Sequence, residues 1–303
     1  MMKKLHSFLK PYLTGRQFVI SVPFIWLFLL TAAPILIVMR ISLSEMDIAS
    51  VANLWTWAAD TLTLKINLSK YLFILHDELY VKTFISSIGY ALENTFFCLI
   101  LGYPFAYFMA RAKTHLRPML LMLVMLPFWT SFLLRIYAWK TLLEDNGVIN
   151  NLLVWSGLIH QPIQIMHTQF SLMIGMVYAY LPFMILPLYS NLVKMDVRLL
   201  EAAADLGASP WKTFWLMTVP LSKQGIIAGS MLVFIPTVGE YVIPELLGGP
   251  QTLNIGRVLW DEFFSNNDWS MASAVAIVMV LLILLPMAIF NHYQSKSYEG
   301  ATS

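Results

Sequence analysis

The sequence predicts an all-α polytopic membrane protein with six membrane-spanning helices. Of its 303 residues, 58% are hydrophobic and 12% are charged, and this charged share is about half that of an ordinary soluble domain. A bilayer core about 30 Å thick needs about 20 mainly apolar residues for each helical span. Windows of about that length with few ionisable side chains define the predicted spans: 17–39, 84–110, 119–143, 170–193, 225–247 and 270–290.

The six windows differ in the ionisable side chains that they contain. The first, fourth and sixth have none, and the second contains only Glu93. The fifth contains Glu240 and Glu245, and the third contains Arg135 and Lys140 near its far end. The apolar run of the first window is longer than the roughly 7 to 15 residues of a signal peptide, so we expect an uncleaved anchor.

Basic residues are distributed unevenly between the two sides of the predicted membrane. With the N-terminus inside, the inner segments hold twelve of the 19 Lys and Arg residues: Lys3, Lys4, Lys10, Arg16, Arg111, Lys113, Arg117, Lys194, Arg198, Lys212, Lys223 and Lys296. Cytoplasmic loops carry an excess of Lys and Arg, so both termini are predicted to be cytoplasmic. The single cysteine, Cys98, lies inside a predicted span and leaves no disulfide framework.

The outer loops carry more acidic than basic residues. The largest, residues 40–83, is expected to cap the outer face, and the third contains Gly248-Gly249-Pro250. An acidic outer surface attracts cations. Ordinary solvated loop charge explains the same composition equally well, and both interpretations stay open.

The inner loop between the fourth and fifth spans, residues 194–224, predicts two short surface helices. Residues 197–206 place apolar side chains on one helical face. Gly207 follows, where a helix would end in a left-handed residue. Ser209 and Pro210 then provide an N-cap and a proline at the first helical position, so a second helix should run towards Thr218.

This loop resembles the "EAA" loop of ABC importer permeases. The matching residues are Glu201, Ala202, Ala203, Asp205, Gly207 and Pro220. The resemblance implies a coupling helix that docks on the ATP-hydrolysing subunit. Glu201 and Asp205 are four residues apart and share one face of the predicted helix, which suits such docking. An inert amphipathic surface helix is the alternative.

The wider chain, from about residue 17 to 290, resembles the spermidine and putrescine permeases. The resemblance is carried by residues 101–106 (LGYPFA), 126–139 (LPFWTSFLLRIYAW) and 234–249 (FIPTVGEYVIPELLGG). The third stretch is most similar to the putrescine-system subunit. The family implies the type I ABC importer permease fold, with residues 1–303 as one transmembrane permease domain in a bacterial inner membrane. It implies four kinds of partner: a second homologous permease, a dimer of ATP-binding subunits, an external or periplasmic binding protein and the polyamine itself.

Motifs for catalysis and metal binding are missing from the sequence. There is no G-x-x-x-x-G-K-[ST] phosphate loop, so the chain is not expected to bind ATP, to need a cofactor or to act as an enzyme. The six histidines are scattered, without H-E-x-x-H spacing, and predict no metal site. No nucleic-acid partner is expected, whereas contact with lipid is.

Acidic and aromatic side chains inside the spans are candidates for a substrate pathway. A charged side chain costs about 2.5 to 3.5 kcal/mol at the bilayer centre, so it normally faces a wet cavity or the bundle interior. In straight helices the candidates would lie at similar depths. They are Glu240, Tyr241, Trp129, Glu93, Tyr178 and Tyr180. Packed core aromatics are the alternative for the rings, and Glu93 could instead pair with Arg135 or with the second permease.

Other function classes remain possible from the sequence. An ABC permease for another small solute, including an anion, fits the coupling loop equally well. A secondary transporter fits the composition, but its internal inverted repeats are not detected. A membrane-embedded enzyme has little support because no nucleophile, base or metal set converges.

Overall fold

The computed structural model is almost entirely helical and divides into two compact units. It describes residues 15–47, 50–51, 55–58 and 61–299. The first unit comprises the described residues up to Ile74 together with Glu262–Leu281, and the second comprises Leu75–Asp261 and the chain from Leu282. Lys3, Lys4 and Lys10, which contribute to the predicted orientation, lie outside the described residues.

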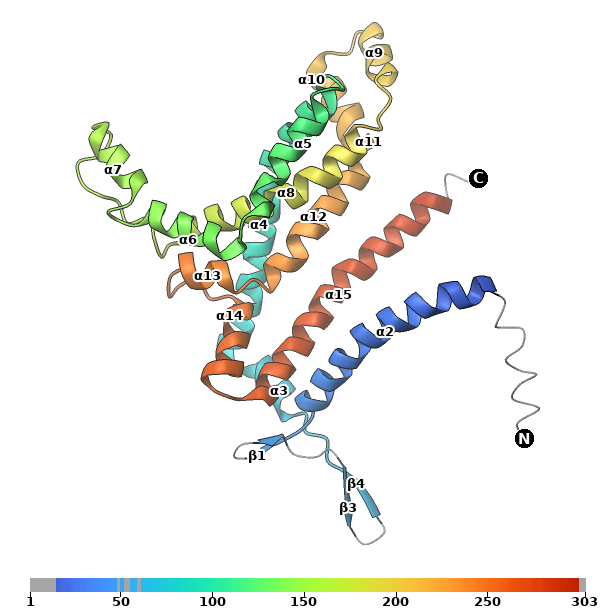
Figure 1. Ribbon diagram of the computed structural model, residues 1–303, viewed down its shortest axis with the longest axis vertical. Helices are drawn as coiled ribbons and strands as arrows, with labels where there is room; N and C mark the ends of the chain where they lie inside the picture. Colours follow the sequence, from blue (N-terminus) through green and yellow to red (C-terminus); the bar gives the residue numbers. More distant parts are fainter. Residues whose placement is uncertain (1–14, 48–49, 52–54, 59–60, 300–303) are drawn as a thin grey trace. The chain divides into compact units, whose positions relative to one another are not determined.

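The first unit contains a long apolar helix and two small β-hairpins (Figure 1). Its elements are α2 (Gly15–Ser42), β1 (Met46–Asp47), β2 (Ser50–Val51), β3 (Trp55–Ala58), β4 (Thr61–Leu64), α3 (Ser69–His76) and the start of α15 (Trp269–Glu299). Strands β3 and β4 are antiparallel, with Trp55 opposite Leu64. These four strands were not predicted from the sequence of the loop 40–83.

Lys70 of α3 joins three segments of this unit. Its ammonium group donates to Ser44 O and to Ser270 Oγ. Ser270 Oγ also lies 2.8 Å from Ile41 O. Burial lowers the pKa of Lys70, and the charges of Asp268 and Glu45 oppose this shift. The end of α2, α3 and the start of α15 are therefore held together by one amino group and one hydroxyl.

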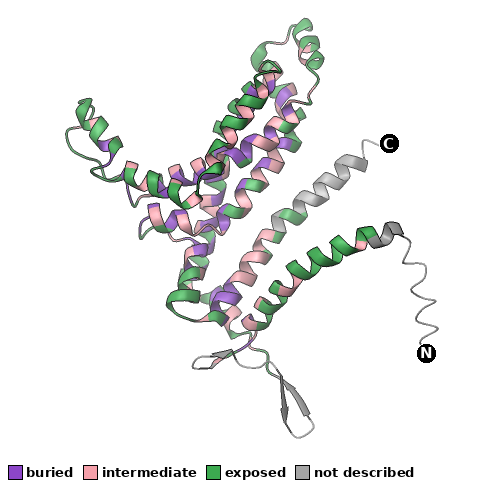
Figure 2. Cartoon of the chain, viewed as in Figure 1, coloured by how far each residue is buried: buried purple, intermediate pink, exposed green. Residues whose placement is uncertain are grey.

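Three long helices form the core of the second unit: α4 (Glu78–Arg111), α8 (Gln169–Leu192) and α12 (Lys223–Val238). Buried residues are concentrated along these helices (Figure 2). Asp77 caps α4 by accepting from Leu79 N at 2.9 Å, and Thr168 opens α8 with a capping box. Asn94 Nδ2 donates to Thr237 Oγ1 at 2.9 Å, which links α4 to α12 inside the core.

Glycine allows α12 to approach α8 closely. A Cβ atom on Gly225 would lie 2.8 Å from Asn191 Cβ, and one on Gly229 would lie 3.1 Å from Met184 O. Both distances are shorter than ordinary van der Waals contact. The two glycines are four residues apart, and small residues at this spacing are typical of closely packed membrane helices.

The third predicted span, 119–143, is not one straight helix. It contains α5 (Arg117–Met125), the 3-10 turn η2 (Leu126–Trp129) and α6 (Phe132–Leu143), with a bend of 87° between Arg117–Trp129 and Phe132–Trp155. Thr130 and Ser131 have extended backbone, with ψ of 152° and 135°, which breaks the helical hydrogen-bond ladder. The following helix is α7 (Val148–Trp155).

The fifth predicted span, 225–247, is also interrupted. Helix α12 ends at Val238, and α13 (Val242–Leu247) and α14 (Ile255–Trp260) follow. A proline ring clashes with the carbonyl four residues earlier in a helix. Pro244 therefore opposes a helix that would continue through Glu240, and the span bounds 225–247 stay a prediction.

Three described helices are long and apolar enough to cross a membrane: Val19–Ser42, Glu78–Arg111 and Gln169–Leu192. Two bent pairs raise the number to five if each counts as one span. The apolar part of α15 that meets the same criteria, Trp269–Leu284, is shorter than a full span. The six-span count therefore stays a prediction.

The close approach of α12 and α8 makes Gly225 sensitive to a single methyl group. We expect Gly225→Ala to lower the thermal unfolding temperature in detergent, because overpacking costs about 1 to 3 kcal/mol. Gly89→Ala is the matched control, since a Cβ there meets nothing within 4 Å. Equal unfolding temperatures for the two variants would contradict the close packing.

Candidate functional site

The predicted coupling loop begins with α9 (Arg198–Asp205), which ends in a Schellman motif. Gly207 has φ of +81°, and its N–H donates to Ala204 O at 2.9 Å. The N–H of Ala208 donates to Ala203 O at 3.0 Å. These two bonds satisfy carbonyl groups that the helix end leaves free. The left-handed conformation predicted for Gly207 is confirmed.

The second helix of the loop starts as predicted. Ser209 caps it by accepting from Lys212 N at 3.4 Å, and Pro210 occupies the first turn. The helix continues beyond the predicted end at Thr218. It comprises α10 (Pro210–Thr213), the π-helical turn η3 (Phe214–Thr218) and α11 (Val219–Leu221).

The loop exposes acidic and large apolar side chains together. No residue of α9, which is described throughout, is buried, and both Glu201 and Asp205 are exposed. Leu206 is 89% exposed, and Trp211 and Leu216 are each 71% exposed. Exposed apolar side chains of this size, rimmed by charge, are typical of a protein interaction surface.

Aromatic rings connect this loop to α4. The Phe214 ring lies edge-on to Tyr103 at 5.5 Å and to Tyr107 at 6.0 Å between ring centroids, and Trp211 stacks on it at 6.3 Å. The hydroxyl of Tyr103 lies 2.8 Å from Ser222 Oγ. Sequence analysis missed this cluster. The spacing of Tyr103 and Tyr107, four apart and therefore on one helix face, is the signal that could have found it.

Glu240 lies in the break between α12 and α13 and is bonded through both carboxylate oxygens. Oε1 accepts from Val242 N at 3.0 Å and Ile243 N at 3.4 Å, so the side chain caps α13. Oε2 accepts from the hydroxyl of Tyr180 on α8. None of the described Lys, Arg or His side chains forms an ion pair with it.

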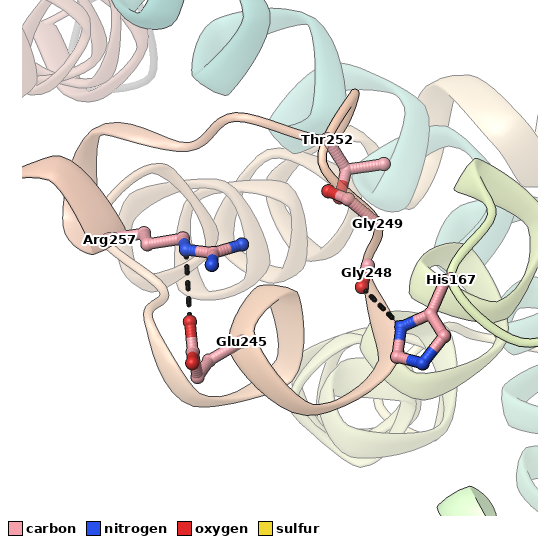
Figure 3. Close-up of polar contacts among 6 residues, drawn as sticks. All are labelled: His167, Glu245, Gly248, Gly249, Thr252 and Arg257. Atoms are coloured by element: carbon pink, nitrogen blue, oxygen red, sulfur yellow. Dashed lines mark hydrogen bonds and ion pairs between the residues drawn. The ribbon is translucent and has the colours of Figure 1, made fainter.

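The segment after α13 packs directly against this break. A Cβ atom on Gly256 would lie 2.5 Å from Gly239 O and 2.7 Å from Glu240 O, so only glycine fits there. Figure 3 shows two contacts that hold the segment. Arg257 Nε lies 2.9 Å from Glu245 Oε2, and His167 Nδ1 lies 3.0 Å from Gly248 O.

Glu93 lies at a groove of about 820 Å³ between α4 and α8. Its carboxylate accepts from Gln169 Nε2 at 2.9 Å. Tyr178 also lines the groove and packs edge-on against Trp139 at 5.4 Å. The other lining residues are apolar: Phe96, Phe97, Leu101, Phe170, Met173, Ile174 and Val177. The described contacts of Glu93 do not include the pairing with Arg135 that the sequence left open.

The six predicted pathway residues fall into separate groups in this chain. Tyr180 contacts Glu240, whereas Tyr178, two residues away on α8 and so on a different face, lines the groove of Glu93. Tyr241 stacks on Trp260 at 4.3 Å. Trp129, at the end of η2, is 75% exposed.

The described residues hold no cluster of three or more His, Cys, Asp or Glu side chains that could bind a metal ion. Cys98 is buried and free.

Comparison with known proteins gives the family. Residues 95–299 match the family described as "Binding-protein-dependent transport system inner membrane component". The spermidine/putrescine transport system permease protein PotB of Salmonella typhimurium (strain SL1344) is 40% identical over 265 residues, which cover 88% of each chain. PotB of Haemophilus influenzae is 38% identical over 281 residues, covering 93% of this chain and 94% of the relative.

A solved structure shares the fold. A bacterial ABC transporter involved in the import of the acidic polysaccharide alginate has a chain that superposes with a TM-score of 0.65 at 18% identity, covering 97% of this chain and 99% of that one. The chain therefore belongs to the family of binding-protein-dependent transport system inner membrane components, as a multi-pass ABC importer permease that is not itself catalytic.

Proposed function

We propose that the chain forms half of the translocation pathway of an ATP-driven importer for polyamines, with putrescine as its substrate. The PotB relatives are named for spermidine and putrescine, and residues 234–249 resemble the putrescine-system subunit. The observation that carries the proposal is the carboxylate of Glu240, which sits at a helix break without a basic partner among the described residues.

The bonds to Glu240 fix its position without neutralising it. Two backbone amides and the Tyr180 hydroxyl are neutral donors, so the carboxylate keeps a net negative charge that a passing amine can balance. A protonated amine also gains about 0.5 to 2 kcal/mol over an aromatic face. Contacts of that size permit release as well as binding, which a transport pathway needs.

Glu93 and its groove provide a second point of contact for a diamine. The alkyl chain of putrescine is apolar between two charged ends, and the groove is apolar with one carboxylate. Tyr178 offers a ring in the same groove. We propose that Trp129 and Tyr241 complete the pathway in the assembled transporter, in which a second permease supplies the opposite wall.

The loop 194–224 is the proposed contact with a dimer of ATP-binding subunits. Its exposed acids, Leu206 and Trp211 fit a docking surface, and the Phe214 cluster offers a rigid connection from that surface to α4. An external or periplasmic binding protein would deliver the substrate on the opposite side. Both termini are proposed to be cytoplasmic.

The charge of Glu240 can be separated from its hydrogen bonds by two variants. Glu240→Gln removes the charge and keeps an acceptor for α13, whereas Tyr180→Phe removes one donor and keeps the charge. We expect Glu240→Gln to reduce uptake of putrescine about tenfold, because a hydrogen bond to a charged group contributes about 1.5 to 3 kcal/mol. Tyr180→Phe should have a smaller effect.

The measurement is uptake of putrescine and of a singly charged amine, together with the yield of assembled complex. Coulomb attraction grows with ligand charge, so the loss should be larger for the diamine. Equal loss for both amines, or a larger loss in Tyr180→Phe, would indicate that Glu240 only caps α13.

The coupling role of the loop can be tested through backbone strain. Gly207→Val should uncouple ATP hydrolysis from transport, because a β-branched residue disfavours the positive φ that the Schellman motif requires. Gly207→Asn should be milder, since Asn tolerates this conformation. The readout is substrate-stimulated hydrolysis by the complete transporter.

Gly157 provides the matched control for strain. Its φ is +73°, and a Cβ at either glycine meets nothing within 4 Å, so Gly157→Val introduces similar strain away from the loop. Normal coupling in Gly207→Val, or equal uncoupling in both valine variants, would argue against a role of this loop.

A further inference from the structure

Arg135, in the first turn of α6, has an uncompensated positive charge. Its Nε and Nη1 atoms are buried without hydrogen-bond partners. Its Cζ lies 5.5 Å from the centroid of the Phe128 ring and 5.8 Å from that of Phe132. Ring faces stabilise a cation only modestly, and an unsatisfied buried charged donor is costly. The contacts within the described chain therefore do not account for a guanidinium at this position.

One nitrogen of the guanidinium, Nη2, is not covered by neighbouring atoms. Nη2 is not among the fully covered atoms and donates no hydrogen bond to a described residue. The one side-chain ion pair found in the described part of the chain joins Arg257 to Glu245. Glu93, the acid that the sequence offered as a partner, binds Gln169 instead. The described residues of the second unit therefore supply no acceptor for Nη2.

An exposed apolar side chain lies beside this charge. Leu134, next to Arg135 in α6, is 66% exposed. We call Leu134, with Nη2 of Arg135, the α6 face. Its apolar side chain and single cation are complementary to an apolar surface that carries one carboxylate.

We infer that the second permease subunit covers the α6 face and that an acidic side chain of that subunit binds Arg135 at Nη2. This contact rests on the two-permease assembly proposed above. It makes Arg135 a positioning residue of the subunit interface and assigns it no contact with the polyamine.

A lipid phosphate is the competing acceptor. Phosphate groups bind arginine best through two parallel hydrogen bonds, but Nε and Nη1 are covered and leave only Nη2 free. Ordering a mobile headgroup for one bond is unfavourable, whereas a folded subunit presents its carboxylate already in place. The geometry therefore favours the protein partner.

The test uses the complete transporter with a tag on this chain. Arg135→Gln should lower the amount of second permease that co-purifies in detergent by about tenfold, the change that corresponds to about 1.4 kcal/mol. Lys140→Gln removes a positive charge from the same helix and should leave the partner bound.

Replacing the acids of the second permease one at a time should identify one variant with the same loss. Reversing both charges, with Arg135→Glu, should restore binding.

A second measurement does not depend on changing Arg135. A photo-crosslinking residue in place of Leu134 should form an adduct with the second permease in the assembled transporter. Adducts with lipid alone, or loss of bound phospholipid from Arg135→Gln with the partner retained, would show that lipid is the acceptor and overturn the inference. Equal loss of the partner in Arg135→Gln and Lys140→Gln would also overturn it. If the wild-type complex contained no second permease, both the proposed two-permease assembly and this contact would be contradicted.

Discussion

A bilayer core offers no water to a broken helix, and this constraint explains the surroundings of Glu240. Where backbone leaves a helix at membrane depth, its free N–H groups need partners from the protein. Glu240 supplies an acceptor to two of them, and its other oxygen binds Tyr180. Gly256 allows the following helix to approach the same break. A residue proposed for transport is thus also required for the local fold.

The predicted coupling loop, residues 194–224, differs from this break. Outside the bilayer its helix ends can be satisfied by water, yet both are closed internally, by Gly207 at the end of α9 and by Ser209 at the start of α10. Closed ends make a short two-helix element rigid. The Phe214 ring, packed against Tyr103 and Tyr107, attaches the loop to α4. A rigid element joined to a core helix is able to transmit a displacement, which a flexible loop would absorb.

Local signals made much of this architecture predictable from the sequence. The length of the apolar windows predicted α2, α4 and α8. The two helices of the loop were predicted from Gly207, Ser209 and Pro210, because helix caps and proline act within a few residues. The bend at Thr130 was not predicted, because a hydrophobic window shows the length of a span and not its direction. Pro236 and Pro244 do signal a break near Glu240. The separation of Tyr178 from Tyr180 followed from helix geometry, but which helix each ring meets depends on tertiary packing.

Glu240 and Arg135, two of the charged side chains for which the described residues show no ion pair, both lie near breaks in predicted spans. Their surroundings nevertheless imply different roles. Three neutral donors hold the Glu240 carboxylate in one position, which fits the proposed binding and release of a cation. Arg135 contacts two rings and has no hydrogen-bond acceptor at Nε or Nη1 among the described residues, which fits the inferred acceptor on the second subunit. A charge that the chain itself organises suits a transient ligand, whereas a charge that it leaves incomplete indicates a subunit interface.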